Sequence, residues 1–162
     1  MAGFHTKTFL KHDDYMTPKK VWEDIDDYIP KDKVIWEPFM GDGKSGEYLR
    51  EMGCKKVIHN ENDFFESNEG EVIITNPPFS IKNDVLEKLK ELDKPFIVIL
   101  PQAAINNNSM RECFKDELQI IIPRKRTQFI KNGEDFHEKK CNFDCFYYCY
   151  KMNLSRDIIF LE

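Results

Sequence analysis

Short apolar runs alternate along this chain with segments in which apolar residues recur every three or four positions. Five apolar residues fall on one face of a helix predicted at 18–29: Val21, Trp22, Ile25, Tyr28 and Ile29. Residues 95–101, by contrast, form an almost unbroken apolar run, which is typical of a strand buried on both faces of a parallel sheet. The chain therefore predicts helices and strands in alternation.

The predicted elements follow one another closely. After a polar arm, residues 1–16, helices are predicted at 18–29, 45–52, 82–91 and 110–117. Strands are predicted at 33–38, 55–59, 71–75, 95–101, 118–123 and 143–151, with a further strand at 157–161. Thr17 is expected to cap the first helix, and Ser109 the last. This order predicts an α/β fold with a mostly parallel sheet and right-handed crossovers, in one domain spanning residues 1–162.

Two segments depart from the regular alternation. Only eleven residues lie between His59 and Glu71, which is too few for a helix and another strand. We therefore expect the third strand of the sheet to be short or absent. Only loop separates the strands at 118–123 and 143–151, so one of them is expected to run antiparallel to its neighbours.

The chain is acidic, with a formal net charge of −5, whereas domains that bind nucleic acid are usually basic. A nucleic-acid substrate would need a local patch of cations, and Arg124–Arg126 is well placed because it follows a predicted strand. Cys141, Cys145 and Cys149 recur every four residues, which is the spacing of one strand face rather than the closer pairing of zinc ligands. We expect buried thiols there and no bound metal.

The apolar runs of the chain are all far shorter than the twenty residues needed to cross a membrane. The first residues also lack the pattern of a signal peptide. We therefore expect no contact with a membrane and a reducing, intracellular location, cytoplasmic or nuclear, rather than secretion.

The most informative motif is Asn76-Pro77-Pro78-Phe79, which directly follows the predicted strand at 71–75. Each proline removes an N–H and restricts the residue before it, so the turn is stiff and its oxygens remain open acceptors. Asn76 Oδ1 and the Pro77 carbonyl could each accept one hydrogen of an exocyclic amino group, while Phe79 stacks on the ring. A proline turn that merely ends an edge strand is the plainer alternative.

A glycine-rich turn lies upstream, where Gly41, Gly43 and Gly46 follow a predicted strand and open a helix in the spacing G-x-G-x-x-G. The Gly-Lys-Ser sequence at 43–45 suggests a phosphate-binding loop, but that pattern needs a glycine where Pro38 stands. A nicotinamide site fits the glycines but gives the proline turn no role. Glu37 at the strand end would repel a pyrophosphate but could bind the ammonium group of S-adenosylmethionine.

Taken together, these motifs resemble those of the S-adenosylmethionine-dependent N6-adenine methyltransferases, over about residues 13–150. Thr17-Pro18 resembles the N-terminal cofactor motif of that family, and residues 37–43 resemble its glycine-rich cofactor loop. Asp63-Phe64-Phe65, followed by the proline turn, resembles its adenine pocket. The resemblance implies a three-layer, Rossmann-like class I methyltransferase fold, with S-adenosylmethionine as the cofactor.

The resemblance also implies roles for individual residues. Those implied to act on the target base are Asn76, Pro77, Phe79 and Asp63. Those implied to bind the cofactor are Thr17, Glu37, Phe39, Gly41, Gly43, Asn76 and a ribose-binding acid, for which we choose Glu61, with Asn60 or His59 as alternatives. By their positions, Arg124, Arg126, Lys131 and Asn107 are expected to contact the substrate. The substrate is expected to be nucleic acid, DNA before RNA, with the target base flipped out or single-stranded.

Two alternatives and one departure from the family remain at this stage. Members that methylate DNA usually carry a target-recognition insert, and residues 80–124 leave no room for one, so a second copy or another partner could supply recognition. A protein glutamine N5-methyltransferase is the alternative enzyme, because it holds a planar amide in the same Asn-Pro-Pro turn, although tyrosine usually follows there. A catalytically silent methyltransferase-like subunit is the alternative of another class, which the intact motifs oppose.

Overall fold

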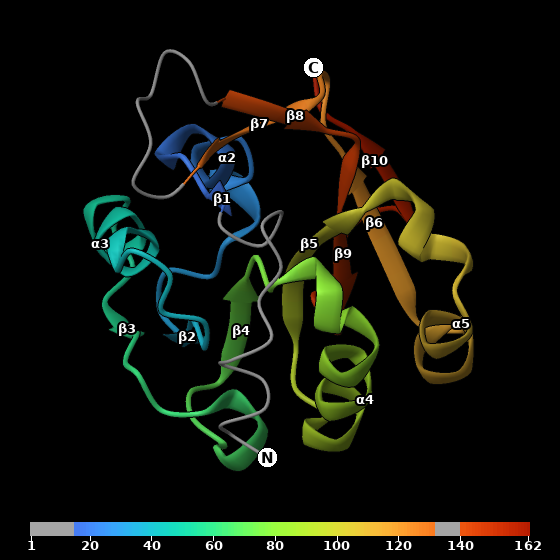
Figure 1. Ribbon diagram of the computed structural model, residues 1–162, viewed down its shortest axis with the longest axis horizontal. Helices are drawn as coiled ribbons and strands as arrows, with labels where there is room; N and C mark the ends of the chain where they lie inside the picture. The colour runs from blue at the N-terminus through green and yellow to red at the C-terminus, as the bar shows by residue number, and fades with distance from the viewer. Residues whose placement is uncertain (1–14, 132–139) are drawn as a thin grey trace.

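The computed structural model describes residues 15–131 and 140–162, and a seven-stranded sheet forms its centre (Figure 1). Its strands are β2 (Val34–Trp36), β3 (Lys56–Ile58), β4 (Val72–Thr75), β5 (Phe96–Pro101), β6 (Leu118–Ile122), β9 (Cys145–Tyr150) and β10 (Ile158–Phe160). They lie in the order β10-β6-β9-β5-β4-β2-β3. Because β9 is antiparallel to β5 and β6 while the other pairs are parallel, the expected mixed sheet is confirmed.

Helices cover both faces of this sheet. They are α2 (Lys19–Glu23), α3 (Lys44–Glu51), α4 (Lys82–Leu92) and α5 (Asn108–Phe114), with short 3₁₀ turns η2 (Asp26–Tyr28), η3 (Phe64–Glu66), η4 (Phe79–Ile81) and η5 (Gln102–Asn106). Successive strand residues point to opposite faces, so neighbours in sequence join different layers. Ile35 and Ile74 pack with α2 and α3, whereas Trp36 and Ile73 pack with α4 and α5.

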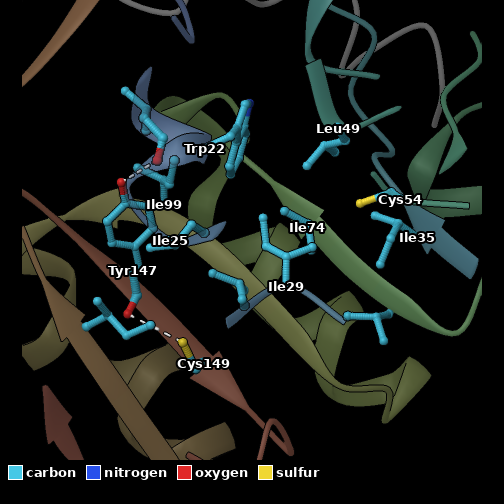
Figure 2. Close-up of a cluster of buried hydrophobic side chains, with 14 of the residues drawn as sticks. Trp22, Ile25, Ile29, Ile35, Leu49, Cys54, Ile74, Ile99, Tyr147 and Cys149 are labelled. Atoms are coloured by element: carbon cyan, nitrogen blue, oxygen red, sulfur yellow. Dashed lines mark hydrogen bonds between the residues drawn. The ribbon is translucent and has the colours of Figure 1, made fainter. Parts of the chain in front are cut away.

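The layer that contains α2 and α3 is held to the sheet by a buried hydrogen bond as well as by packing (Figure 2). Trp22 and Ile25 of the α2 region meet Ile74 of β4 in this layer. The hydroxyl of Tyr147 on β9 donates a hydrogen bond of 2.6 Å to the backbone oxygen of Val21. Burial raises the pKa of this phenol above its ordinary value, so the donated proton is retained.

A second, three-stranded antiparallel sheet was not predicted. It consists of β1 (Tyr15–Met16), β7 (Thr127–Lys131) and β8 (Lys140–Phe143), in the order β1-β7-β8. β7 has the alternation of a half-buried strand, since Thr127 and Phe129 are buried and Gln128 is exposed. Its partner β1 lies at the other end of the sequence, with Tyr15 opposite Lys131, so no local pattern announced the pairing.

The predicted strand face of three cysteines is wrong for Cys141. This residue lies on β8 of the small sheet, whereas Cys145 and Cys149 lie on β9 of the large one. Cys145 and Cys149 are buried free thiols, as expected. Burial raises the pKa of each of these two thiols to about 12, so they are protonated at neutral pH.

Several predicted boundaries and caps differ from the structure. The first helix ends at Glu23 instead of residue 29, although Ile25 and Ile29 are still buried as expected. Pro18 occupies the position before α2, so Thr17 does not cap it. The cap of α5 is Asn107, whose Oδ1 accepts the Met110 N–H at 2.7 Å, and not Ser109.

The shortened edge of the sheet agrees with the sequence. Between β3 and β4 the described chain forms a single turn of 3₁₀ helix, Phe64–Glu66, in place of a helix and strand. No helix within residues 15–131 and 140–162 has both the length and the apolar character needed to span a membrane.

Candidate active site

The proline turn and the glycine turn lie side by side at the carboxyl edge of the sheet, because β2 and β4 are parallel neighbours. Glu37 follows β2 and joins the two strand ends, with only 2% of its surface exposed. Its carboxyl group accepts the Phe39 N–H at 2.9 Å, the Thr75 hydroxyl and the Asn76 N–H. Burial raises the pKa of Glu37 to about 8, against the opposing effect of these hydrogen bonds. Glu37 thus fixes the base of the proline turn from within the protein.

Asn76 has one satisfied and one unsatisfied side-chain atom. Its Nδ2 donates to Thr17 Oγ1 at 2.8 Å, which brings the N-terminal motif onto the proline turn. Its Oδ1 is buried and has no hydrogen-bond partner among the residues that the structure describes. Buried acceptors are normally bonded, so an open one marks a place for a donor. Phe79, three residues later, is half-buried in η4 and packs edge-on against Phe129 with 6.5 Å between ring centroids.

The glycine turn adopts a backbone that side-chain-bearing residues rarely take. Gly41 and Gly43 have φ values of +52° and +81°. The Gly43 N–H bonds to the Met40 oxygen at 2.8 Å and closes the turn immediately before α3. A Cβ added to Gly41 would lie 3.2 Å from the sulfur of Met16 on β1. The glycine turn therefore lies close to β1 of the small sheet, which ends directly before Thr17.

His59, an alternative to Glu61 as the ribose-binding residue, makes two contacts at this site that the sequence did not predict. Gly46, in the first turn of α3, donates its N–H to His59 Nδ1 at 3.0 Å, so Nδ1 is the unprotonated nitrogen. The proton is then on Nε2, which lies 3.0 Å from the Phe39 oxygen and donates to it. Burial lowers the pKa of His59 and keeps the ring neutral. A Cβ on Gly46 would come within 2.4 Å of Nδ1, which explains the third glycine of the motif.

An aromatic cluster adjoins the turn and contains the predicted Asp63-Phe64-Phe65 segment. The Phe64 ring lies 5.2 Å from both Phe39 and Phe65, and 5.6 Å from Trp36, between centroids. Asp63 Oδ1 caps η3 by accepting the Phe65 N–H at 2.9 Å. Its Oδ2 is a second buried acceptor without a partner in the described part of the chain. Phe39 thus packs against Phe64, the residue after Asp63, while Glu61 lies nearby in sequence with an exposed side chain.

The residues expected to contact substrate differ in whether their side chains are already bonded within the protein. Arg124 is exposed, but Arg126 pairs with Asp144 at 3.0 Å. Asn107 is committed to its helix cap and donates to Asn83 at 3.0 Å. The backbone of Lys131 belongs to β7, and its side chain lies outside the described residues.

An open pocket of about 700 Å³ lies at the carboxyl end of β5, on the same edge of the sheet as Asn76. It is lined by Pro101, Gln102, Ala103, Ile105, Asn106, Arg126, Asp144 and Phe146. Gln102 and Asn106 thus offer the exposed amides that were expected from Asn107. Within residues 15–131 and 140–162, no three His, Cys, Asp or Glu side chains gather closely enough to hold a metal ion.

Comparisons with known proteins find resemblance in structure only. No family model matches the sequence, and no curated protein does. A solved structure of a proposed RNA methyltransferase from Pyrococcus horikoshii superposes with a TM-score of 0.55, at 14% identity over 85% of this chain and 87% of that one. The fold is that of the class I methyltransferases.

Two further solved structures are similar to a smaller degree. A Thermoplasma acidophilum protein gives a TM-score of 0.49, at 12% identity over 83% of this chain and 86% of its own. A proposed class I S-adenosylmethionine-dependent methyltransferase from Listeria monocytogenes gives 0.48, at 10% identity over 98% and 69%. Within the class I fold, the extra strand β10 extends the sheet beyond β6, and the missing third strand shortens it beyond β3.

Proposed function

We propose that this protein is an S-adenosylmethionine-dependent methyltransferase that methylates the N6 amino group of adenine in nucleic acid, with DNA favoured over RNA. The single observation that carries the proposal is the buried, unbonded Oδ1 of Asn76 in a turn stiffened by two prolines. An open acceptor in that position suits an amino group on a flat ring. The half-buried Phe79 three residues later supplies an aromatic surface for that ring.

The residues around the glycine turn fit the cofactor. The left-handed backbone at Gly41 and Gly43 lets the turn offer its main chain to a ligand without a Cβ of its own, beside the side chains of Met16 and Met40. The unbonded Asp63 Oδ2, in the residue before Phe64, is proposed to accept a further hydrogen bond from the target base. Thr17, Glu37 and Glu61 are proposed to complete the site, although the carboxylate of Glu37 is enclosed by donors of its own chain.

The chemistry that the chain itself provides is orientation and charge stabilisation. S-adenosylmethionine supplies a methyl group on a cationic sulfur when it is bound. The amino nitrogen of adenine is a poor nucleophile because its lone pair is delocalised into the ring. Asn76 Oδ1 and the Pro77 carbonyl accept its two hydrogens and favour a tetrahedral nitrogen, and these bonds strengthen as positive charge develops there. A neutral amide is too weak a base to take the proton, which leaves afterwards to water.

The proposal is tested by methyl transfer from labelled S-adenosylmethionine to single-stranded DNA, duplex DNA, RNA and protein extracts, with nucleoside digestion of the product. We expect N6-methyladenine. Asn76→Ala should lower the rate about a hundredfold, or about 3 kcal/mol, because it removes an acceptor that acts mainly in the transition state. Binding of S-adenosylhomocysteine, measured by calorimetry, should change little.

Asn68→Ala is the matched control, since Asn68 is exposed and precedes β4, whereas Asn76 follows it. Full activity of Asn76→Ala would refute the chemistry proposed for the proline turn. The net charge of −5 favours a protein glutamine as the second candidate substrate. Methylation of a glutamine side chain in the protein arm, with none in the nucleic-acid arms, would establish that candidate instead.

A further inference from the structure

The edge strand β10 exposes two large apolar side chains. Ile158 is 54% exposed and Phe160 is 71% exposed, the highest values among the large hydrophobic residues that the structure describes. They alternate with Ile159, which packs against the core together with Leu161, so Ile158 and Phe160 share one face of the strand. Edge strands of native proteins are normally protected by charge, by proline or by a cover.

The backbone of β10 is also open for pairing. The Asp157 carbonyl accepts the Ile120 N–H at 2.8 Å, and the Leu161 N–H donates to Ile122 at 2.9 Å. In the parallel ladder of β10 with β6, odd-numbered residues therefore direct their N–H and C=O groups toward β6. The same groups of Ile158 and Phe160 face the free edge, and within residues 15–131 and 140–162 no strand pairs with that edge.

We infer that β10 is a dimerisation edge, which pairs antiparallel with β10 of a second copy of this chain. A two-fold axis at Ile159 would place Ile158 of one copy opposite Phe160 of the other. Of the registers about a two-fold axis, this is the one in which both outward-facing residues exchange N–H···O=C bonds with residues of the partner's β10. All four exposed apolar side chains then gather on one face of a continuous sheet.

Charge supports a second copy as the partner, and this register in particular. The pairing that joins residues 158 and 160 also brings Arg156, in the bend before β10, toward Glu162 of the partner, which follows the partner's β10, at both ends of the ladder. Both residues are exposed, and opposite charges facing each other across strands stabilise antiparallel pairs. The strand is thus self-complementary in shape, in hydrogen bonding and in charge.

The inference is independent of the proposed function and has a structural consequence. β10, β6, β5 and β4 all run in the same direction, because β9 is antiparallel to both β6 and β5. If the two copies of β10 pair antiparallel, β4 of one copy therefore runs opposite to β4 of the other. The two carboxyl edges, each with its own Asn76, would then open at opposite ends of the joined sheet. Neither copy would complete the other's site.

Sedimentation velocity on the full chain over a range of concentrations tests this inference. We expect a reversible dimer. Phe160→Ser should weaken dimerisation about tenfold or more, because each dimer loses two aromatic side chains from the interface. Ile105→Ser, which changes an exposed apolar residue on another part of the surface, should leave the dimer intact.

A charge exchange tests the register. Glu162→Arg should weaken the dimer by placing it opposite Arg156, and the double variant Arg156→Glu with Glu162→Arg should restore it. Circular dichroism spectra identical to the parent's would confirm that each variant is folded. A parent protein that is monomeric throughout, or a dimer that survives Phe160→Ser, would overturn the inference. Failure of the double variant to restore the dimer would overturn the register.

Discussion

At the scale of single residues, the absence of a side chain at Gly46 and the position of the His59 ring depend on each other. The imidazole occupies the space in which a Cβ of residue 46 would lie, and the same imidazole accepts the Gly46 N–H. A residue with a Cβ at position 46 is therefore incompatible with the imidazole in its present place.

Gly46→Ala is therefore expected to destabilise the fold even though alanine favours helices. The methyl group would come within 2.4 Å of Nδ1 and force the ring away from its bond. Overpacking of this kind costs about 1–3 kcal/mol, more than the helix propensity of alanine returns. Urea unfolding should show this loss, while Lys44→Ala, at the exposed first residue of the same helix, should stay within about 0.5 kcal/mol of the parent. Equal stability of Gly46→Ala and parent would refute the close approach of α3 to His59.

At the scale of elements, the first turn of α3 is held from two sides. Trp22 Nε1, from α2, donates to Ser45 Oγ at 3.1 Å. His59, after β3, holds Gly46 and also the glycine turn through Phe39. The hydrogen bond from Gly46 to His59 requires a neutral imidazole, so the attachment of α3 to the glycine turn is sensitive to acid.

The pH dependence follows from the direction of the shift. The pKa of His59 in the folded protein lies below the 6.5 of an ordinary histidine. Between these two values the unfolded chain binds a proton that the folded chain does not, so stability is complete above about pH 6.5 and falls as the pH falls through the folded pKa. His59→Asn keeps an acceptor for Gly46 but cannot titrate. Its unfolding free energy should decline less than the parent's between pH 7 and pH 5, and parallel curves for the two proteins would contradict this account.

The elements that the sequence predicted correctly are those whose pattern is complete within a short stretch. β5 is apolar throughout, α4 places Val85, Leu86 and Leu89 on one buried face, and the two turns of the site are local motifs. What escaped prediction depends on distant partners. Three features arise only when the chain has folded: the pairing of β1 with β7, the contact of Thr17 with Asn76, and the two hydrogen bonds of the His59 ring.

At the scale of the whole molecule, the negative charge of the chain limits how it could hold nucleic acid. The net charge is −5, so phosphate contacts must come from a few local cations. Arg124 lies in the segment between β6 and β7, while neighbouring Arg126 is already paired with Asp144. A substitution of Arg124 therefore tests the phosphate contact without breaking an ion pair that the structure shows.

Arg124→Glu is expected to raise KM for a single-stranded oligonucleotide and to leave the affinity for S-adenosylhomocysteine unchanged. Lys115→Glu, at the other end of β6, changes the net charge by the same amount, from −5 to −7, and serves as the control. KM should also rise with salt, and more shallowly in the Arg124 variant, because fewer counterions are released on binding. The same KM for both variants would refute a local role for Arg124.

The chain has only two tryptophans: Trp22 contacts the end of the glycine turn, and Trp36 lies in the aromatic cluster with Phe64 and Phe39. Trp22 bonds to Ser45 at the start of α3, and Trp36 ends β2 directly before the turn, with the ammonium group of Lys94 5.7 Å from its ring centroid. Indole fluorescence responds to nearby charge and to changes in packing. All of the protein's tryptophan emission therefore originates beside the proposed cofactor site, and the unlabelled chain contains its own optical reporter of that site.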